Sequence, residues 1–489
     1  MNSLEKFNRW WGVLIGCAVC IALGIAALVM HWTSWASLVW LVLGGSLVVF
    51  SATRMGGKED GAWLGGWVAA RVAIGSIVAV GIAWQVGDDL ITDARMYLSV
   101  GSRLAHVWTT GQATLPWEVL SNYVVGYFVV VAAQLSIVPD QIFVVITNVL
   151  LGAHGTAMVY SIANEVGGHR VARIASVLSL IDPVGIVFCG FNMKEAIALW
   201  LLMAFVLALV RLVTRRRWGW LLVVMSISLA MGMIRPYLVV LWVMVLVPVV
   251  VVVPRRTTHR VMVGGAAFAS AIVLGIAAWW VIGGVVKALA QGSLSEMLDM
   301  IQFGMTGKGQ AGLGTESGML GEARLESPGA ILKFLPVGIA RQFISPIPWK
   351  TAESWYKLLI PGMLMRYAFW PFFFLGMWTC VADRSRARMV LVSVALGTLA
   401  MYGVITLGSS IRHVTQFAPL TMIFAALGYV HRDRFEVVTP LLYFVIVTGL
   451  FITTTGVYAG VMYFLPLIGM ATLVLTWWFR SRATLRLQG

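Results

Sequence analysis

Long apolar runs separated by short polar stretches dominate the sequence. Most are close to the roughly 20 residues that a helix needs to cross the hydrocarbon core of a bilayer. The pattern therefore predicts an all-α membrane protein that crosses the bilayer many times. The runs cover residues 11–30, 36–53, 64–86, 119–137, 142–163, 171–190, 193–214, 218–234, 237–254, 261–283, 363–382, 389–407, 413–430, 437–457 and 458–479, with a weaker one at 329–345.

The composition supports the same class. Hydrophobic residues make up 60% of the 489 residues and charged residues 11%, whereas a soluble domain has about half apolar and about a quarter charged residues. The surface must therefore face lipid. Little chain is left for a separate soluble domain, so we expect one integral membrane domain over 1–489, with any chemistry in loops and helix ends.

The formal net charge of +15 comes from basic residues in short loops between the apolar runs. These loops lie at 211–217, 254–260, 383–388 and 431–434. Clusters of this kind mark cytoplasmic loops of membrane proteins. The charge is thus explained by sidedness rather than by nucleic-acid binding, and both termini are predicted to be cytoplasmic.

Two runs break the alternation of sides and are predicted not to cross. One of the three runs between the 85–118 loop and Lys194 must stay on one side if Arg211 is to be cytoplasmic, and we take it to be the run at 119–137. The run at 329–345, with Pro336 and Arg341, suits a re-entrant or surface-lying helix. About fourteen crossings remain. The long polar stretches then face outward: a first outer loop at 85–118 and a large outer region at 284–362.

With this sidedness, polar residues gather at the outer surface. Ionisable groups at membrane depth are costly unless they pair or line a wet cavity, so the gathering points to a site, although loop ends are polar everywhere. The residues are Asp88, Asp89, Asp93, Lys194, Glu195, Arg235, Arg412 and His413, together with the loops around 296–326 and 345–357.

The first outer loop contains a predicted surface helix. Thr92 can cap it and Asp93 favours its first turn. Apolar residues recur at helical spacing, which predicts a helix lying along the membrane surface, with Asp93 held at the water boundary. An alternative is that Asp93 only starts the helix. The apolar stripe is Met96, Val100, Leu104 and Val107, with Arg95, Ser99 and Arg103 off it.

This region resembles a known family. The pattern Asp93-Ala94-x-x-Tyr97, followed by Leu104, Gly111 and Pro116, looks like the polyprenyl-phosphate-dependent glycosyltransferases of the GT-C fold, in the branch with the protein O-mannosyltransferases and aminoarabinose transferases. Pro183 with Lys194-Glu195 resembles the family's second acidic motif. Arg412-His413, with Pro419 in the next helix, resembles its late basic motif. Pro116-Trp117 replaces the usual proline pair, and Lys194-Glu195 replaces a lone acid.

The resemblance implies a GT-C-like bundle with outer-surface juxtamembrane helices, and it suggests roles for the polar residues. Transfer from a lipid-phosphate sugar needs a carboxylate to take the acceptor proton and cations to stabilise the departing phosphate. Asp93 is the expected base, and Asp88 or Asp89 could assist it or ligate a divalent ion. Metal dependence stays open.

The basic residues are candidates for the phosphate. They are Arg412, Arg235 and Lys194, with His413 assisting or packing and Glu195 near the substrate. The alternatives are that Lys194 and Glu195 form structural ion pairs, and that Arg235 snorkels to the interface.

The sequence therefore predicts a membrane glycosyltransferase that moves a sugar from a polyprenyl-phosphate donor to a glycan, lipid or protein acceptor outside the cytoplasm. A polymerase or ligase of lipid-linked glycans is a close alternative. A transporter or flippase is a third reading. The expected partners are the lipid-linked donor, the acceptor and membrane lipids, with no nucleic acid, and the expected location is a bacterial inner membrane.

Overall fold

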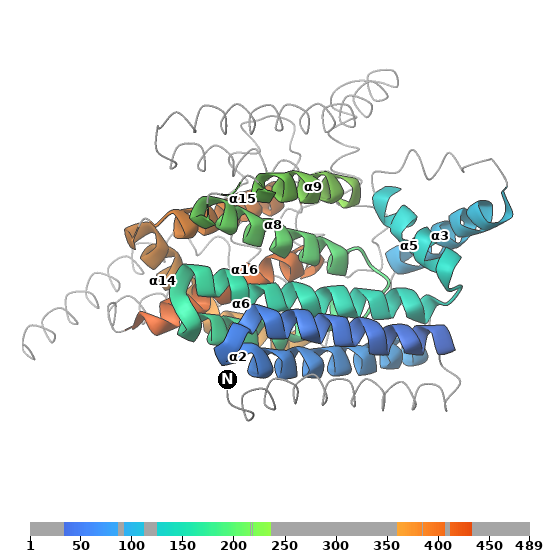
Figure 1. Cartoon of the computed structure of the whole chain (residues 1–489), viewed down its shortest axis with the longest axis horizontal. Helices are drawn as coiled ribbons and strands as arrows, with labels where there is room; N and C mark the ends of the chain where they lie inside the picture. The colour runs from blue at the N-terminus through green and yellow to red at the C-terminus, as the bar shows by residue number, and fades with distance from the viewer. Residues whose placement is uncertain are drawn as a thin grey trace, which may run out of the picture.

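A computed structural model describes residues 34–86, 92–111, 125–215, 217, 219–235, 359–383, 385–405 and 411–432. The elements in these ranges are all helices, which confirms the predicted all-α class (Figure 1). Three are long and apolar enough to cross a membrane, at Trp35–Gly81, Gln141–Leu180 and Glu195–Arg215. The expected total of about fourteen crossings depends on runs outside the described residues. Nearly all of the 284–362 region also lies outside them.

Helix α2 (Trp35–Val86) consists of two limbs that fold back on each other. The chain reverses at Gly57, whose φ of 66° lies in the left-handed region that glycine adopts without steric cost. Across the hairpin, a Cβ on Gly61 would lie 2.6 Å from the Thr53 carbonyl oxygen, so the limbs pack closely. Figure 1 shows them side by side, and they match the predicted runs 36–53 and 64–86.

Helix α6 (Gln141–Leu180) is likewise two limbs, which meet at Gly168 with φ 79°. Asp140 caps its start by accepting a hydrogen bond from the Ile142 backbone nitrogen at 2.9 Å and another from Ser34 Oγ at 2.7 Å. Burial raises the pKa of Asp140, but hydrogen bonds from Ser37 and Ser34 outweigh it and hold that pKa below its ordinary value. Residues 34 and 140 therefore lie at one end of the bundle.

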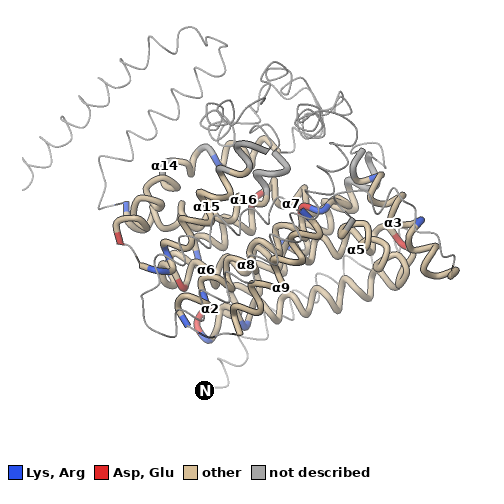
Figure 2. The backbone as a smooth tube through the Cα atoms, turned by 90° about the horizontal axis from the view of Figure 1, so that it is seen from above, with Lys and Arg blue, Asp and Glu red and all other residues tan. Residues whose placement is uncertain are grey.

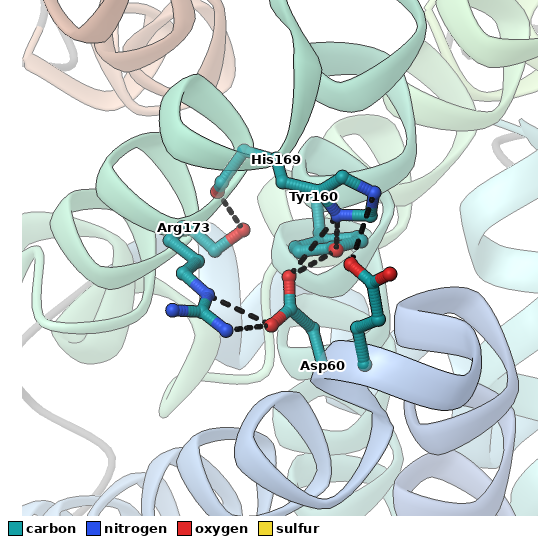
Figure 3. Close-up of polar contacts among 7 residues, drawn as sticks. Asp60, Tyr160, His169 and Arg173 are labelled. Atoms are coloured by element: carbon teal, nitrogen blue, oxygen red, sulfur yellow. Dashed lines mark hydrogen bonds and ion pairs between the residues drawn. The ribbon is translucent and has the colours of Figure 1, made fainter.

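The two reversals meet at the opposite end of the bundle (Figure 3). Asp60, which is fully buried, accepts hydrogen bonds from the Tyr160 hydroxyl and from the Arg173 guanidinium. His169 Nδ1 lies 3.4 Å from Asp60 Oδ2, and its Nε2 lies 3.5 Å from Glu59 Oε2. This cluster joins the turn of α2 to the turn of α6.

Helices α8 (Glu195–Arg215) and α9 (Gly219–Ile234) run between these two ends. Arg215 Nη2 lies 2.8 Å from Glu165 Oε1, near the Gly168 reversal, while Arg235 pairs with Glu195 at the far end. We call the end with Gly57, Gly168 and Arg215 the basic end. The end with Asp140, Glu195 and Arg235 is called the site end.

Helices α14 (Ile360–Asp383), α15 (Arg386–Ile405) and α16 (Ile411–Val430) complete the described bundle. At the basic end, Arg388 Nε donates to the Val166 carbonyl oxygen at 3.0 Å. Leu427 packs on Gly167, so α16 begins at the site end with Ile411. Helices α14 and α16 touch closely, and Gly376 leaves room for the Phe424 carbonyl oxygen.

The described Arg-rich loops share one end of the bundle. Residues 211–215, 217, 383, 385–388 and 431–432 lie at the basic end, whereas Lys194 and Arg235 lie at the site end. Figure 2 shows charged positions at both ends of the helices. This grouping is the one that the positive-inside pattern predicts.

Helices α3 (Thr92–Thr110) and α5 (Val125–Ile137) pack together at one extremity of the molecule (Figure 1). The described residues of α5 begin at Val125, and residues 119–124 lie outside them. That the 119–137 run does not cross therefore stays a prediction. The buried stripe of α3 contains Tyr97, Val100 and Leu104. Met96 is 37% exposed and Tyr97 contacts α5, so the buried stripe is shifted by one residue from the predicted apolar stripe at this end.

The apolar run at 171–190 is broken within the membrane layer. The second limb of α6 ends at Leu180, and α7 (Pro183–Cys189) follows after Ile181 and Asp182. The Asp182 side chain accepts from the backbone nitrogens of Val184 and Gly185 at 3.3 and 3.2 Å, and Pro183 occupies the first turn, where its missing N–H costs nothing. Pro183 therefore begins a short helix.

Candidate functional site

Glu195 and Arg235 form a buried ion pair at the site end. Glu195 is the first residue of α8, and Arg235 follows the last residue of α9. Their exposed fractions are 2% and 1%, and Arg235 Nη2 donates to Glu195 Oε1. Arg235 therefore lies inside the bundle rather than extending to the interface, and Glu195 has an ion-pair partner, whereas its role at the substrate stays a prediction.

Lys194 connects this pair to the surface helix. Its Nζ lies 5.5 Å from the centre of the Tyr97 ring, and the residue is 8% exposed. An ammonium over an aromatic face is attracted by the negative face of the ring. Tyr97 lies four residues after Asp93, which is one helical turn, so both residues belong to the same face of α3. The Lys194 side chain thus lies within about one turn of Asp93 along α3.

A hydrogen-bond network fixes the loop that presents Lys194. The Asn148 amide donates to the Phe191 carbonyl oxygen at 2.9 Å and to the Met193 carbonyl oxygen at 3.2 Å. The Tyr127 hydroxyl donates to Asn192 Oδ1 at 3.0 Å, and Asn192 Nδ2 lies 3.5 Å from the Ala94 carbonyl oxygen. The loop is therefore tied to α3, α5 and α6, which positions Lys194 and Glu195 beside the first turn of α3.

The remaining predicted residues are placed by their backbone or lie outside the described residues. Asp93 is the second residue of α3 as described. Arg412 and His413 belong to the first turn of α16, which begins at the site end. Asp88 and Asp89 lie outside the described residues. Among those that are described, no group of three His, Cys, Asp or Glu side chains could hold a metal ion.

A second buried charge cluster lies at the break between α6 and α7, and the sequence reading did not identify it. Arg366 Nη2 lies 3.3 Å from Asp182 Oδ2. Arg71 Nη1 donates to the carbonyl oxygens of Leu180 and Asp182 at 2.9 and 3.2 Å. The sequence contains a signal for this cluster, because Arg71 and Asp182 lie inside apolar runs. Charged residues are rare there and mark functional or structural sites.

Gly185 in α7 leaves room for the side chains of this cluster. A Cβ on Gly185 would lie 3.1 Å from Arg71 Nη2 and 3.3 Å from Asp182 Oδ2, which is tighter than an ordinary van der Waals contact. Glycine at this position therefore allows the guanidinium to lie against the helix. The cluster holds α7 in place, and α7 leads directly into the loop of Lys194.

One comparison with known proteins confirms the predicted resemblance over part of the chain. Residues 122–281 match the family model for dolichyl-phosphate-mannose-protein mannosyltransferase. The matched segment carries Lys194, Glu195 and Arg235. No curated protein sequence matches the chain significantly.

Two solved structures of the oligosaccharyltransferase from Archaeoglobus fulgidus are also similar. One is AglB in complex with an inhibitory peptide and a dolichol-phosphate, and the other is the apo form. Each is 14% identical to this chain at a TM-score of 0.45, and the alignments cover 84% of this chain. They cover 56% of the oligosaccharyltransferase, so the chain spans little more than half of its length.

Proposed function

We propose that this integral membrane protein is a GT-C-type glycosyltransferase that moves a sugar from a polyprenyl-phosphate donor to an acceptor on the extracytoplasmic side. The observation that carries the proposal is the convergence of Lys194, Glu195 and Arg235 beside the helix of Asp93, at the end of the bundle opposite to the basic loops. The family match over 122–281 supports the same class.

The position of the site suits a lipid-linked substrate. The isoprenoid tail cannot leave the membrane and the sugar cannot enter it, so the reacting phosphate must lie at the membrane surface. The site end is bounded there by the amphipathic helix α3, whose Arg103 side is exposed while Leu104 is buried. A phosphate held next to Lys194 would lie at this boundary.

The proposed reaction is a direct displacement at the anomeric carbon. The acceptor oxygen forms the new glycosidic bond as the bond to the carrier phosphate breaks, and the electron pair leaves with the phosphate. Asp93 takes the acceptor proton, with Asp88 or Asp89 assisting it. Lys194 and Arg412 stabilise the negative charge that the departing phosphate gains, with His413 beside them.

Arg235 has a supporting role in this scheme. Because its guanidinium is buried against Glu195, it fixes that carboxylate rather than binding the phosphate directly. This changes the role first expected of Arg235. Any divalent ion would be held by carboxylates of the first outer loop, because hard cations prefer oxygen ligands.

The cellular placement follows from the charge pattern. The basic end would face the cytoplasm, both termini would be cytoplasmic, and a bacterial inner membrane would fit the Arg-rich loops. A polymerase or ligase of lipid-linked glycans would share the proposed chemistry.

A transporter or flippase is the second candidate, and one observation favours it. Asp182, Arg71 and Arg366 are buried charges at a broken helix inside the membrane layer, which is a feature of secondary transporters. We rank it second because the cluster's described contacts bind the helices to one another. An assay of sugar transfer between molecules would distinguish a transferase from a transporter or flippase.

The test is transfer of radiolabelled sugar from membrane lipid to polymer, lipid or protein. Membranes containing the unaltered protein are compared with membranes containing Asp93→Asn, which keeps the shape of the side chain and loses its basicity. Asp383→Asn at the basic end is the matched control. We expect label to stay on the donor lipid only with Asp93→Asn. Equal transfer by all three proteins would refute the proposal.

A further inference from the structure

One oxygen of the buried Glu195 carboxylate has no hydrogen-bond partner among the described residues. Oε1 accepts from Arg235, whereas Oε2 is buried without a hydrogen bond in the described part of the chain. Buried carboxylate oxygens in folded proteins are almost always hydrogen-bonded, because burial removes the water that would otherwise bind them. An unpartnered oxygen at a substrate site points to a ligand that supplies the missing donor.

The surrounding charges limit the chemistry of that ligand. A metal ion at Oε2 would be repelled by the guanidinium of Arg235 and by the ammonium of the adjacent Lys194. A phosphate oxygen would be repelled by the carboxylate itself. A neutral hydrogen-bond donor meets neither objection, and a sugar presents several such hydroxyls.

We propose that Glu195 Oε2 accepts a hydrogen bond from one hydroxyl of the donor sugar, which makes Glu195 a specificity-determining residue. This rests on the proposed function, because it assumes that a lipid-linked sugar occupies the site end. Lys194 Nζ lies 5.5 Å from the Tyr97 ring, the Tyr97 ring lies 4.9 Å from the Tyr127 ring, and the Glu195 charge acts on Tyr127. A phosphate next to Lys194 would therefore place the attached sugar ring close to Glu195.

The ion pair with Arg235 gives this contact its selectivity. Because Arg235 fixes Oε1 in a buried position, Oε2 cannot rotate into water when the sugar lacks the matching hydroxyl. A site built around such a hydrogen bond discriminates strongly against the analogue that lacks it. A hydrogen bond to a charged acceptor corresponds to roughly ten- to hundredfold in kcat/KM.

The experiment uses mannose linked through phosphate to a short isoprenyl chain, together with its 2-, 3-, 4- and 6-deoxy analogues. If another sugar is the donor in the membrane assay, that sugar and its deoxy series replace mannose. The proteins are the unaltered chain, Glu195→Gln and Glu165→Gln. Glu165 is the matched control because it also pairs with an arginine, Arg215, but at the basic end.

We expect the unaltered protein and Glu165→Gln to use one deoxy analogue roughly ten- to hundredfold less well than the full sugar. In Glu195→Gln the amide keeps an oxygen for Arg235 and replaces Oε2 by a donor, so this difference should fall to about twofold or less. The comparison is a ratio within one sample, so a lower folded fraction cancels. Binding of non-transferable phosphonate analogues gives the same ratio without turnover.

Two results would overturn the inference. The first is an unchanged preference among the deoxy analogues in Glu195→Gln. The second is a divalent-ion requirement that Glu195→Gln abolishes, which would make Oε2 a metal ligand. If the unaltered protein transferred no sugar from any lipid donor, the proposed function itself would fail, and the inference with it; that outcome differs from transfer with unchanged preference.

Discussion

Replacing Arg235 by methionine removes the positive partner of a carboxylate that is only 2% exposed. Among the described residues, Glu195 Oε2 has no hydrogen-bond partner, and Oε1 accepts from Arg235. The substitution therefore removes the hydrogen bond that Arg235 gives to this buried charge. Breaking a buried pair in this way costs about 3–5 kcal/mol. Arg215→Met breaks a comparable pair with Glu165 at the basic end, where Arg215 is 49% exposed. There the expected cost is only about 0–1 kcal/mol.

The assay is thermal unfolding of the detergent-solubilised protein, followed by fluorescence-detected size-exclusion chromatography at a fixed heating rate. We expect a clear decrease in the apparent Tm for Arg235→Met and almost none for Arg215→Met. The double variant Arg235→Met/Glu195→Leu should recover most of the loss, because a buried pair replaced by apolar side chains is often neutral. Equal losses for the two single variants, or no recovery in the double variant, would refute the reasoning.

Three further predictions concern the site and its support. Lys194→Met should lower sugar transfer about 10²- to 10³-fold, as loss of a charge-stabilising donor does, whereas Lys58→Met should leave transfer unchanged in the same assay. Asp182→Asn should lower the apparent Tm, because it removes the charge that pairs with the buried Arg366 while the amide oxygen still caps α7; an unchanged unfolding curve would contradict the described contacts. Cysteines introduced at positions 93 and 412 should react with a membrane-impermeant reagent from the outside only, and cytoplasmic labelling of either would overturn the assigned sidedness.

Much of the helical framework could be predicted from apolar runs. The run at 193–214 corresponds to α8 (Glu195–Arg215), and the run at 218–234 corresponds to α9 (Gly219–Ile234). Both agree because lipid imposes a minimum length on a crossing and arginine marks its cytoplasmic end. That residues 119–137 do not cross rests on the same rules and stays a prediction.

The breaks within runs were harder to predict. The apolar run at 171–190 gives no sign of an interruption other than Asp182 and Pro183, and the interruption depends on Arg71 and Arg366 from distant helices. An Asp-Pro pair alone is compatible with a helix start or a helix end. Whether this pair starts or ends a helix is decided by the packing of α2 and α14 against α7.

The candidate site could be predicted as a set but not as pairs. Sidedness placed Lys194, Glu195 and Arg235 at one end of the bundle, and the structure brings them together there. The pairing of Glu195 with Arg235 spans 40 residues and requires α8 and α9 to be antiparallel neighbours. The roles of Asp93, Arg412 and His413 stay predictions, because the structure places their backbone only.

The most direct test of the account is release of the carrier lipid, because it does not require the acceptor to be known in advance. Purified protein in liposomes, supplied with a crude envelope extract as acceptor, is given donor lipid with a labelled isoprenyl chain, and free polyprenyl phosphate is measured over time. The account predicts release by the unaltered protein and by Asp383→Asn, and a loss of at least a hundredfold with Asp93→Asn. Release that is equal with and without the Asp93 carboxylate would contradict a transfer site at this end of the bundle.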